Sequence, residues 1–215
     1  MNKIPSELLG KTIGIIGSPG SGKSFLASKF QMFENAHVVF ENQQKFPKKI
    51  VENLKERRDL FETILWFRNK QIQDWDYAKS IVNKDNLVII DSTFYQYQLY
   101  IHLYIQDKYY IKILQELAAI DNKHFAPPDI MIYISTTKKL VNSYLSIREA
   151  KWSLFTTGFI NFLSSMAIHS QKFIESRQEV FGNLIEIKRE DYDFDKQSDF
   201  NNLIYKIVQL THNHD

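Results

Sequence analysis

The chain has 215 residues, which is enough to bury one complete β-sheet with helices on both faces. Charged residues make up 24% and apolar residues 44%, as in an ordinary soluble globular protein, and a net charge of +2 gives no reason to expect a nucleic acid polymer or an anionic membrane as partner. The absence of cysteine excludes disulfides, thiolate metal sites and thiol catalysis.

Five short apolar runs, rich in β-branched residues, predict strands along the chain. They alternate with longer helical patterns, and this alternation predicts parallel strands joined by helical crossovers in one sheet. The expected strands are Thr12 to Ile16, His37 to Phe40, Leu87 to Ile90, Asp129 to Ile134 and Leu184 to Ile187.

Helical periodicity fills the intervals between these strands. The expected helices are Gly22 to about Phe33, Lys48 to about Asn83, Thr93 to about Asp121, Thr137 to Ile147, Gly158 to Phe181, and Ser198 to Leu210. No repeat and no Pro/Gly-rich linker interrupts this order, so we expect residues 1–215 to form a single domain. No segment has the apolar length of a signal peptide or a membrane span, and we therefore expect a cytoplasmic protein.

One segment matches the phosphate-binding pattern G-x-x-x-x-G-K-[ST] completely: Gly17-Ser18-Pro19-Gly20-Ser21-Gly22-Lys23-Ser24. Glycines let successive backbone N–H groups turn inward around an anion, and the helix that follows adds the positive end of its dipole. Lys23 can reach the β- and γ-phosphates, and the Ser24 hydroxyl can bind Mg²⁺. A glycine-rich turn without a ligand is the alternative interpretation. An apolar strand before the loop and an amphipathic helix after it favour a P-loop, so the sequence predicts ATP and Mg²⁺ as cofactors and a P-loop NTPase-type three-layer α/β sandwich.

Two expected strands end in an acidic residue, Glu41 and Asp91. In an open parallel sheet, ligands bind beyond the carboxyl ends of the strands. Phosphoryl transfer to a hydroxyl uses one carboxylate near Mg²⁺ and another to accept the proton of the acceptor. Asp91 follows four apolar residues and is the candidate metal ligand, which leaves Glu41 as the candidate base. Either acid could instead cap a helix or face solvent.

Charge that develops during phosphoryl transfer usually requires an arginine. Arg148 follows the helix that leaves the fourth expected strand, and we expect it to belong to a lid over the phosphates, at about residues 148–157. A lone helical arginine on a solvated face is the plainer alternative.

The order of these parts resembles the deoxyribonucleoside kinase family, which includes deoxyadenosine, deoxyguanosine and deoxycytidine kinases. That family ends its second strand in Glu-Pro-Val, where the Glu accepts the proton of the nucleoside 5′-hydroxyl; here Glu41 is kept and Pro-Val is lost. The family's third strand ends Asp/Glu-Arg-Ser/Thr, and here Ser92 takes the place of the arginine. The fourth strand also resembles the family's Asp-Ile-x-Ile-Tyr-Leu.

This resemblance implies further site residues. Phe46 would line the base pocket, Arg148 would act in the lid, and Lys151 would stand in for a second lid arginine that is Ala150 here. Arg68 matches a helix arginine of the family. The glutamine that pairs with the base would then fall on Phe61, with Glu62 one step away. Because a Phe cannot make those hydrogen bonds, the resemblance does not fix the base.

The remaining candidates are weaker. The six histidines show no metal-ligand spacing, and the aromatic run from Phe94 to Tyr100 is typical of helix packing or of a face in a homodimer. Tyr95 and Tyr97 lie close enough to the end of their strand for one of them to contact a substrate.

Taken together, these features predict the reaction ATP + (deoxy)nucleoside → ADP + (deoxy)nucleoside 5′-monophosphate. Glu41, Lys23 and Arg148 are the predicted catalytic residues. A nucleoside monophosphate kinase is one alternative, although it needs additional arginines around the acceptor phosphate. A non-catalytic nucleotide-binding subunit is another, and the losses at Ser92 and Ala150 are compatible with it.

Overall fold

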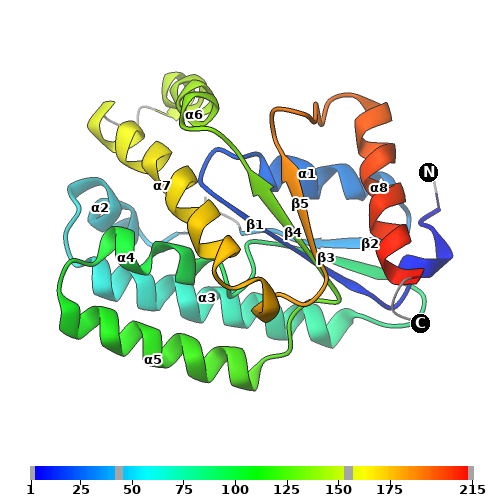
Figure 1. Cartoon of the computed structure of the whole chain (residues 1–215), viewed down its shortest axis with the longest axis horizontal. Helices are drawn as coiled ribbons and strands as arrows, with labels where there is room; N and C mark the ends of the chain where they lie inside the picture. The colour runs from blue at the N-terminus through cyan, green and yellow to red at the C-terminus, as the bar shows by residue number, and fades with distance from the viewer. Residues whose placement is uncertain (1–2, 42–45, 153–156, 213–215) are drawn as a thin grey trace.

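The computed structural model describes residues 3–41, 46–152 and 157–212, except for the side chains at 147–152, 157–160, 162, 178 and 212. Five parallel strands form one sheet in the order β2-β3-β1-β4-β5 (Figure 1). Each strand lies within two residues of its predicted position, and the predicted fold class is confirmed. The strands are β1 (Thr12–Gly17), β2 (Ala36–Val39), β3 (Leu87–Asp91), β4 (Ile130–Ser135) and β5 (Leu184–Lys188).

The α-helices are α1 (Lys23–Lys29), α2 (Lys48–Glu56), α3 (Leu60–Ile81), α4 (Ile101–Tyr104), α5 (Lys108–His124), α6 (Lys138–Trp152), α7 (Thr157–Glu175) and α8 (Gln197–His212). Short 3-10 helices are η1 (Ser6–Leu8), η2 (Phe30–Met32), η4 (Tyr97–Tyr100) and η5 (Gln178–Val180). None of these helices, within the described ranges, is long and apolar enough to cross a membrane.

The prediction of one helix from Lys48 to Asn83 was wrong. The chain turns between α2 and α3, where Arg57 and Asp59 take left-handed backbone conformations with φ of 55° and 47°. Both α2 and α3 place apolar residues against the interior of the protein. The apolar pattern in the sequence therefore continues across the turn and does not reveal it. The turn resets the helical register, and this changes which side chains of α3 face the site.

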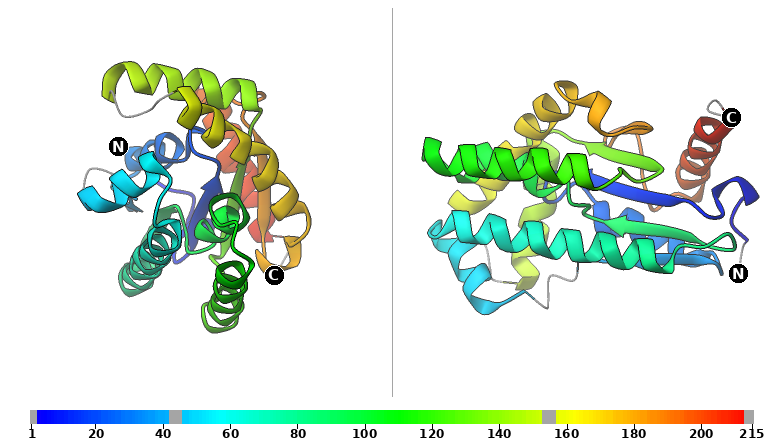
Figure 2. Two further views of the ribbon diagram at one scale, coloured as in Figure 1. Left: turned by 90° about the vertical axis from the view of Figure 1, so that its left-hand side faces the viewer. Right: turned by 90° about the horizontal axis from the view of Figure 1, so that it is seen from below.

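The prediction of one helix from Thr93 to Asp121 was also wrong. The chain forms η4 and α4, then runs extended at Ile105, and α5 begins after Asp107, whose carboxylate accepts a hydrogen bond from the Tyr109 N–H at 2.8 Å. This N-cap explains why a new helix begins there. The break lets α5 pack outside α3 and α4 (Figure 2).

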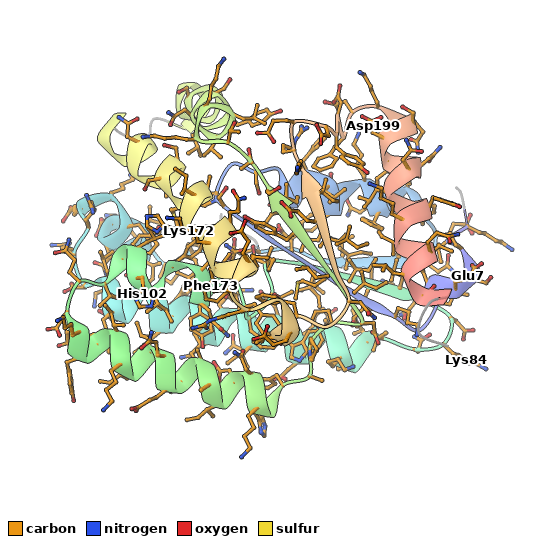
Figure 3. All side chains as sticks on the ribbon, in the orientation of Figure 1. Glu7, Lys84, His102, Lys172, Phe173 and Asp199 are labelled. Carbon is orange, nitrogen blue, oxygen red and sulfur yellow. The ribbon has the colours of Figure 1, made fainter. Side chains whose placement is uncertain are left out.

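Helices cover both faces of the sheet, as the three layers require. Side chains of α1, α8 and η1 pack on one face, and those of α3 and α7 pack on the other, together with the aromatic segment that follows β3 (Figure 3). The central strand β1 is buried along its whole length, as expected for a strand covered on both sides. Within it, Gly14 leaves no room for a side chain: a Cβ there would lie 2.5 Å from Thr93 Cγ2 and 2.7 Å from Pro128 Cγ.

Candidate active site

The P-loop joins β1 to α1 at the carboxyl edge of the sheet. Gly20 and Gly22 have φ of 76° and 99°, which favours glycine. The Lys23 ammonium folds back over the loop and donates hydrogen bonds to the carbonyl oxygens of Gly17 at 3.0 Å and Ser18 at 3.2 Å. The buried hydroxyls of Ser18 and Ser21 have no hydrogen-bond partner. Since a buried hydroxyl normally has a partner, this loop fits a polar ligand such as a phosphate.

A buried glutamine that follows β3 holds the start of this loop. Gln96 accepts a hydrogen bond from the Gly17 N–H at 3.0 Å and donates one to the Gly17 carbonyl at 2.9 Å. The same amide also donates to the Tyr100 hydroxyl. Gln96 therefore ties the P-loop to the segment from which Tyr97, Tyr100 and Tyr104 project, so one residue links the two parts of the site.

Glu41 follows the β2 strand, at the same carboxyl edge of the sheet as the P-loop. It accepts hydrogen bonds from Ser92 Oγ at 3.3 Å and from Gln71 Nε2 at 3.5 Å. Desolvation raises the pKa of Glu41 from 4.5 to about 7; the negative charge of Asp91 adds to this rise, and the Lys23 ammonium opposes it. A carboxylate with a pKa near neutrality can accept a proton at physiological pH.

Asp91 ends β3 opposite Ile15 of β1 and is only 2% exposed. Its successor Ser92 adopts a left-handed conformation, with φ of 70°, a strained arrangement for a residue other than glycine. That turn directs the Ser92 hydroxyl to Glu41, so Asp91 and Glu41 are held close together at the sheet edge.

The oxygen donors near the P-loop fit Mg²⁺. Ser24 lines the cavity, and Asp91 supplies a hard anionic carboxylate close to Glu41. Among the residues that the structure describes, no group of three or more His, Cys, Asp or Glu side chains forms a metal site. Nucleotide-bound Mg²⁺ does not need such a group, because phosphates and waters supply most of its ligands.

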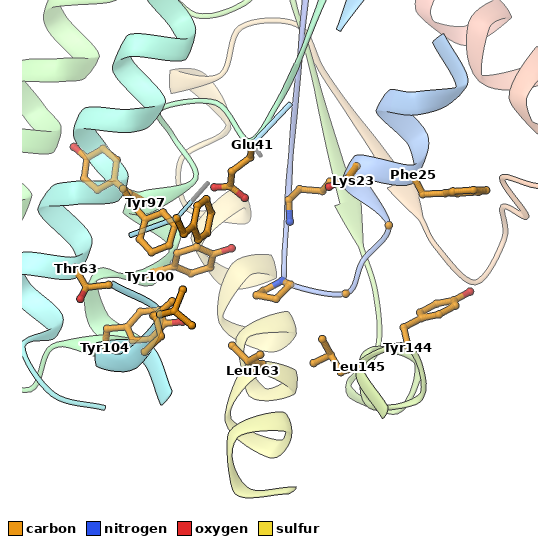
Figure 4. Close-up of a pocket in the computed structure, with 18 of the residues that line it drawn as sticks. Lys23, Phe25, Glu41, Thr63, Tyr97, Tyr100, Tyr104, Tyr144, Leu145 and Leu163 are labelled. Atoms are coloured by element: carbon orange, nitrogen blue, oxygen red, sulfur yellow. The ribbon is translucent and has the colours of Figure 1, made fainter. Parts of the chain in front are cut away.

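A cavity of about 600 Å³ is lined by Lys23, Ser24 and Glu41 together with residues of the surrounding helices (Figure 4). In Figure 4, Lys23 and Glu41 point toward one another between its two ends. One end lies beside the P-loop and is lined by Phe25, Tyr144, Leu145, Arg189, Asp193 and Asp195. We call the other end the aromatic chamber; its described lining consists of Phe46, Val51, Leu54, Ile64, Phe67, Tyr97, Tyr100, Tyr104 and Leu163, with Thr63 and Lys55 beside them.

An AAA domain family matches residues 12–139, which is more than half of the chain. The chain belongs to this AAA domain family. The matched segment begins at β1, contains the P-loop and includes Asp91 at the end of β3. No curated protein matches the chain in sequence.

Solved structures of deoxyadenosine kinase from M. mycoides have the same fold. The structure with the products dCMP and a flexible dCDP is 16% identical, with a TM-score of 0.73, and the match covers 92% of this chain and 99% of the kinase. The structures with dATP and dCTP are 14% and 13% identical, also with TM-scores of 0.73; the matches cover 91% and 92% of this chain and 98% and 99% of the kinase chains. The resemblance to deoxyribonucleoside kinases is thereby confirmed at the level of the fold.

The structure brings Glu41, Phe46 and much of the P-loop to one cavity, whose lining includes Pro19, Gly20, Gly22, Lys23 and Ser24 but not Asp91. It does not bring Phe61, Glu62, Arg68 or Tyr95 there, since none of them is among the described residues that line it. Phe61 stacks on Tyr110 with ring centroids 4.5 Å apart, and Glu62 pairs with Lys49 at 2.9 Å on the surface.

Arg68 and Tyr95 have structural partners instead. Arg68 donates to Asp121 Oδ2 at 2.7 Å, and Tyr95 is buried with its hydroxyl donating to the Val180 carbonyl at 3.2 Å. The turn at residues 57–59 explains the changed register of α3. Arg148 and Lys151 lie on α6, but their side chains are outside the described residues.

Sequence reasoning missed four residues that shape the site. Ile64 and Gln71 are seven apart and therefore share one face of α3. This seven-residue spacing could have identified both residues. Matching the helix to the family at Arg68 instead placed the site-facing positions at Phe61 and Glu62. Arg189 follows β5 at the carboxyl edge, and its guanidinium lies 4.5 Å from the Phe194 ring centroid and 5.4 Å from that of Tyr144. No local pattern marked Gln96.

Proposed function

We propose that this protein is an ATP-dependent kinase that phosphorylates the 5′-hydroxyl of a (deoxy)nucleoside. The observation that carries this proposal is the joint lining of one cavity by the P-loop and by Glu41, a carboxylate whose pKa is about 7. The deoxyadenosine kinase of similar fold has been solved with nucleotides in place, which supports a nucleoside as acceptor here.

In the proposed reaction, ATP places its phosphates on the P-loop and the acceptor hydroxyl lies beside Glu41. The hydroxyl oxygen forms a bond to the γ-phosphorus, the bond from that phosphorus to the bridging oxygen of ADP breaks, and the hydroxyl proton passes to a Glu41 carboxylate oxygen. Lys23 and the loop amides hold the negative charge of the phosphates. Mg²⁺ bound with ATP would neutralise phosphate charge, and Ser24 and Asp91 would hold it.

Arg148 and Lys151 are proposed to cover the transferred group, since they follow the helix that leaves β4. A nucleoside monophosphate as acceptor is less well supported. Among the described residues of the aromatic chamber there is no arginine that would bind its phosphate.

Transfer of labelled γ-phosphate to a panel of nucleosides and nucleoside monophosphates tests the proposal. We expect Lys23→Ala to abolish nucleotide binding and turnover, and Glu41→Gln to abolish turnover while ATP still binds. Lys112→Ala and Glu116→Gln are matched controls, since both residues are exposed on α5, far along the chain from the site. Full activity in Glu41→Gln would remove Glu41 as the base. ATP binding without transfer to any acceptor would instead indicate a non-catalytic nucleotide-binding subunit.

A further inference from the structure

The aromatic chamber offers an acceptor mostly apolar surfaces. Val51 and Leu54 from α2, Ile64 and Phe67 from α3, and Leu163 from α7 form its aliphatic and aromatic walls. Phe46 packs edge-on against Phe67, with ring centroids 5.4 Å apart. Tyr100 and Tyr104 direct their rings into this space, and Tyr97 lines it with its hydroxyl turned away toward Asp121 (Figure 4).

The hydroxyl groups of Thr63, Tyr97 and Tyr100 are already engaged. Thr63 Oγ1 donates to the Asp59 carbonyl at 3.1 Å and accepts from Asn53 Nδ2 at 3.3 Å. The Tyr97 hydroxyl donates to Asp121 Oδ2 at 2.6 Å, and that of Tyr100 contacts the Gly17 carbonyl at 3.5 Å. These side chains therefore present their rings and methyl groups to the chamber.

Arg68 and Gln71, a cation and an amide close to the chamber, also have partners. Arg68 is paired with Asp121, which also binds Tyr97, and lies outside the described lining. Gln71 donates to Glu41 and accepts from the Tyr97 N–H at 3.0 Å. Lys55 is exposed at the rim. Glu41 is the acidic side chain in the described lining of this end of the cavity, and the proposed reaction assigns it the acceptor hydroxyl.

We infer that the chamber selects its acceptor by the shape and apolar faces of a flat ring, and not by hydrogen bonds to the edge of a base. This inference rests on the proposed function and names the class of acceptor: hydroxyl compounds with a flat, weakly polar ring. Burying a hydrogen-bonding edge against these walls has a cost, because the water it loses is not replaced. Hydrogen-bonding sites reject analogues that lack the matching group by about 10⁴-fold or more, whereas apolar pockets discriminate far less.

The test compares thymidine with its nonpolar isostere, in which difluorotoluene replaces thymine, in the phosphate-transfer assay. We expect the isostere to reach a kcat/KM within about tenfold of that of thymidine, or above it. A kcat/KM for the isostere more than about tenfold lower would overturn the inference and leave the proposed kinase activity in place.

Binding measured by calorimetry in the presence of a non-hydrolysable ATP analogue separates the two proposals. If neither compound is phosphorylated but both bind within about tenfold of each other, the proposed function fails and the inference holds. If thymidine binds more than about tenfold better than the isostere, or neither compound binds, the inference fails.

A matched pair of variants at Ile64 tests whether a hydrogen-bonding group added to the chamber changes its preference between the two acceptors. Ile64→Gln is expected to shift the ratio of kcat/KM toward thymidine by about tenfold or more, because it provides an amide partner for the base edge. Ile64→Met keeps an apolar side chain and should leave the ratio unchanged. Leu54→Asn repeats the test from α2 if Ile64→Gln does not fold. An unchanged ratio in both amide variants would contradict the inference.

Discussion

Glu41 provides a prediction in which stability and catalysis depend on the same carboxyl group. Its pKa rises from 4.5 to about 7 on folding, chiefly because desolvation penalises the charged form. The folded protein therefore favours the protonated carboxyl. Its contribution to the free energy of unfolding is fully present below pH 4.5 and is lost as the pH rises through about 7.

The size of the loss follows from the two pKa values. Their difference corresponds to about 3 kcal/mol, most of which is lost between about pH 5 and about pH 8. Gln has the shape of the protonated carboxyl and does not titrate. Relative to the wild type, Glu41→Gln should therefore gain about 2 to 3 kcal/mol in free energy of unfolding over the same pH interval.

Urea denaturation of the nucleotide-free protein at the two pH values measures this change, with Glu116→Gln as the control. Glu116 is an exposed carboxylate that faces Lys112 across 3.9 Å, and its substitution should change stability by less than about 1 kcal/mol. In the transfer assay, wild-type turnover should fall as the pH drops below about 7, where Glu41 is protonated. A stability difference between Glu41→Gln and wild type that does not vary with pH would refute the reasoning from burial.

Three other substitutions test the architecture around the site. Gln96→Ala removes the buried partner of the Gly17 N–H, while the Gly17 carbonyl keeps the Lys23 ammonium. We expect a loss of about 1–3 kcal/mol in urea denaturation and weaker ATP binding. Gln115→Ala on α5 is the control, and unchanged ATP binding would argue against a role in holding the loop. Gly14→Ala places a Cβ 2.5 Å from Thr93 Cγ2 and should cost about 1–3 kcal/mol or more. Thr93→Ser removes that methyl group and should partly restore stability to Gly14→Ala; no recovery would locate the clash elsewhere.

Local sequence patterns predicted the sheet and the P-loop because each depends on consecutive residues. The strands appear as short runs that are apolar at every position, as expected for strands buried on both faces. The P-loop needs glycines, a lysine and a hydroxyl at fixed spacing. The approach of Glu41 and Asp91 also followed from the sequence, since parallel strands bring their carboxyl ends to one edge.

The helical side of the site could not be predicted in the same way. A helical period continues across Arg57 and Asp59, although the chain turns there in a left-handed conformation. The register of α3 after that turn decides that Ile64 and Gln71 face the site and that Phe61 faces Tyr110. A prediction that carries one unbroken helix through this turn assigns the wrong face.

The sequence by itself determined a five-stranded parallel sheet with a phosphate-binding loop, and two acids placed to meet it, because those features are encoded within short stretches of chain. Only the tertiary structure decided how Glu41 acquires its raised pKa and how Gln96 holds Gly17. Burial and hydrogen bonds between residues far apart in sequence depend on how the helices pack. That packing is set by many contacts between distant segments, which no local sequence pattern specifies.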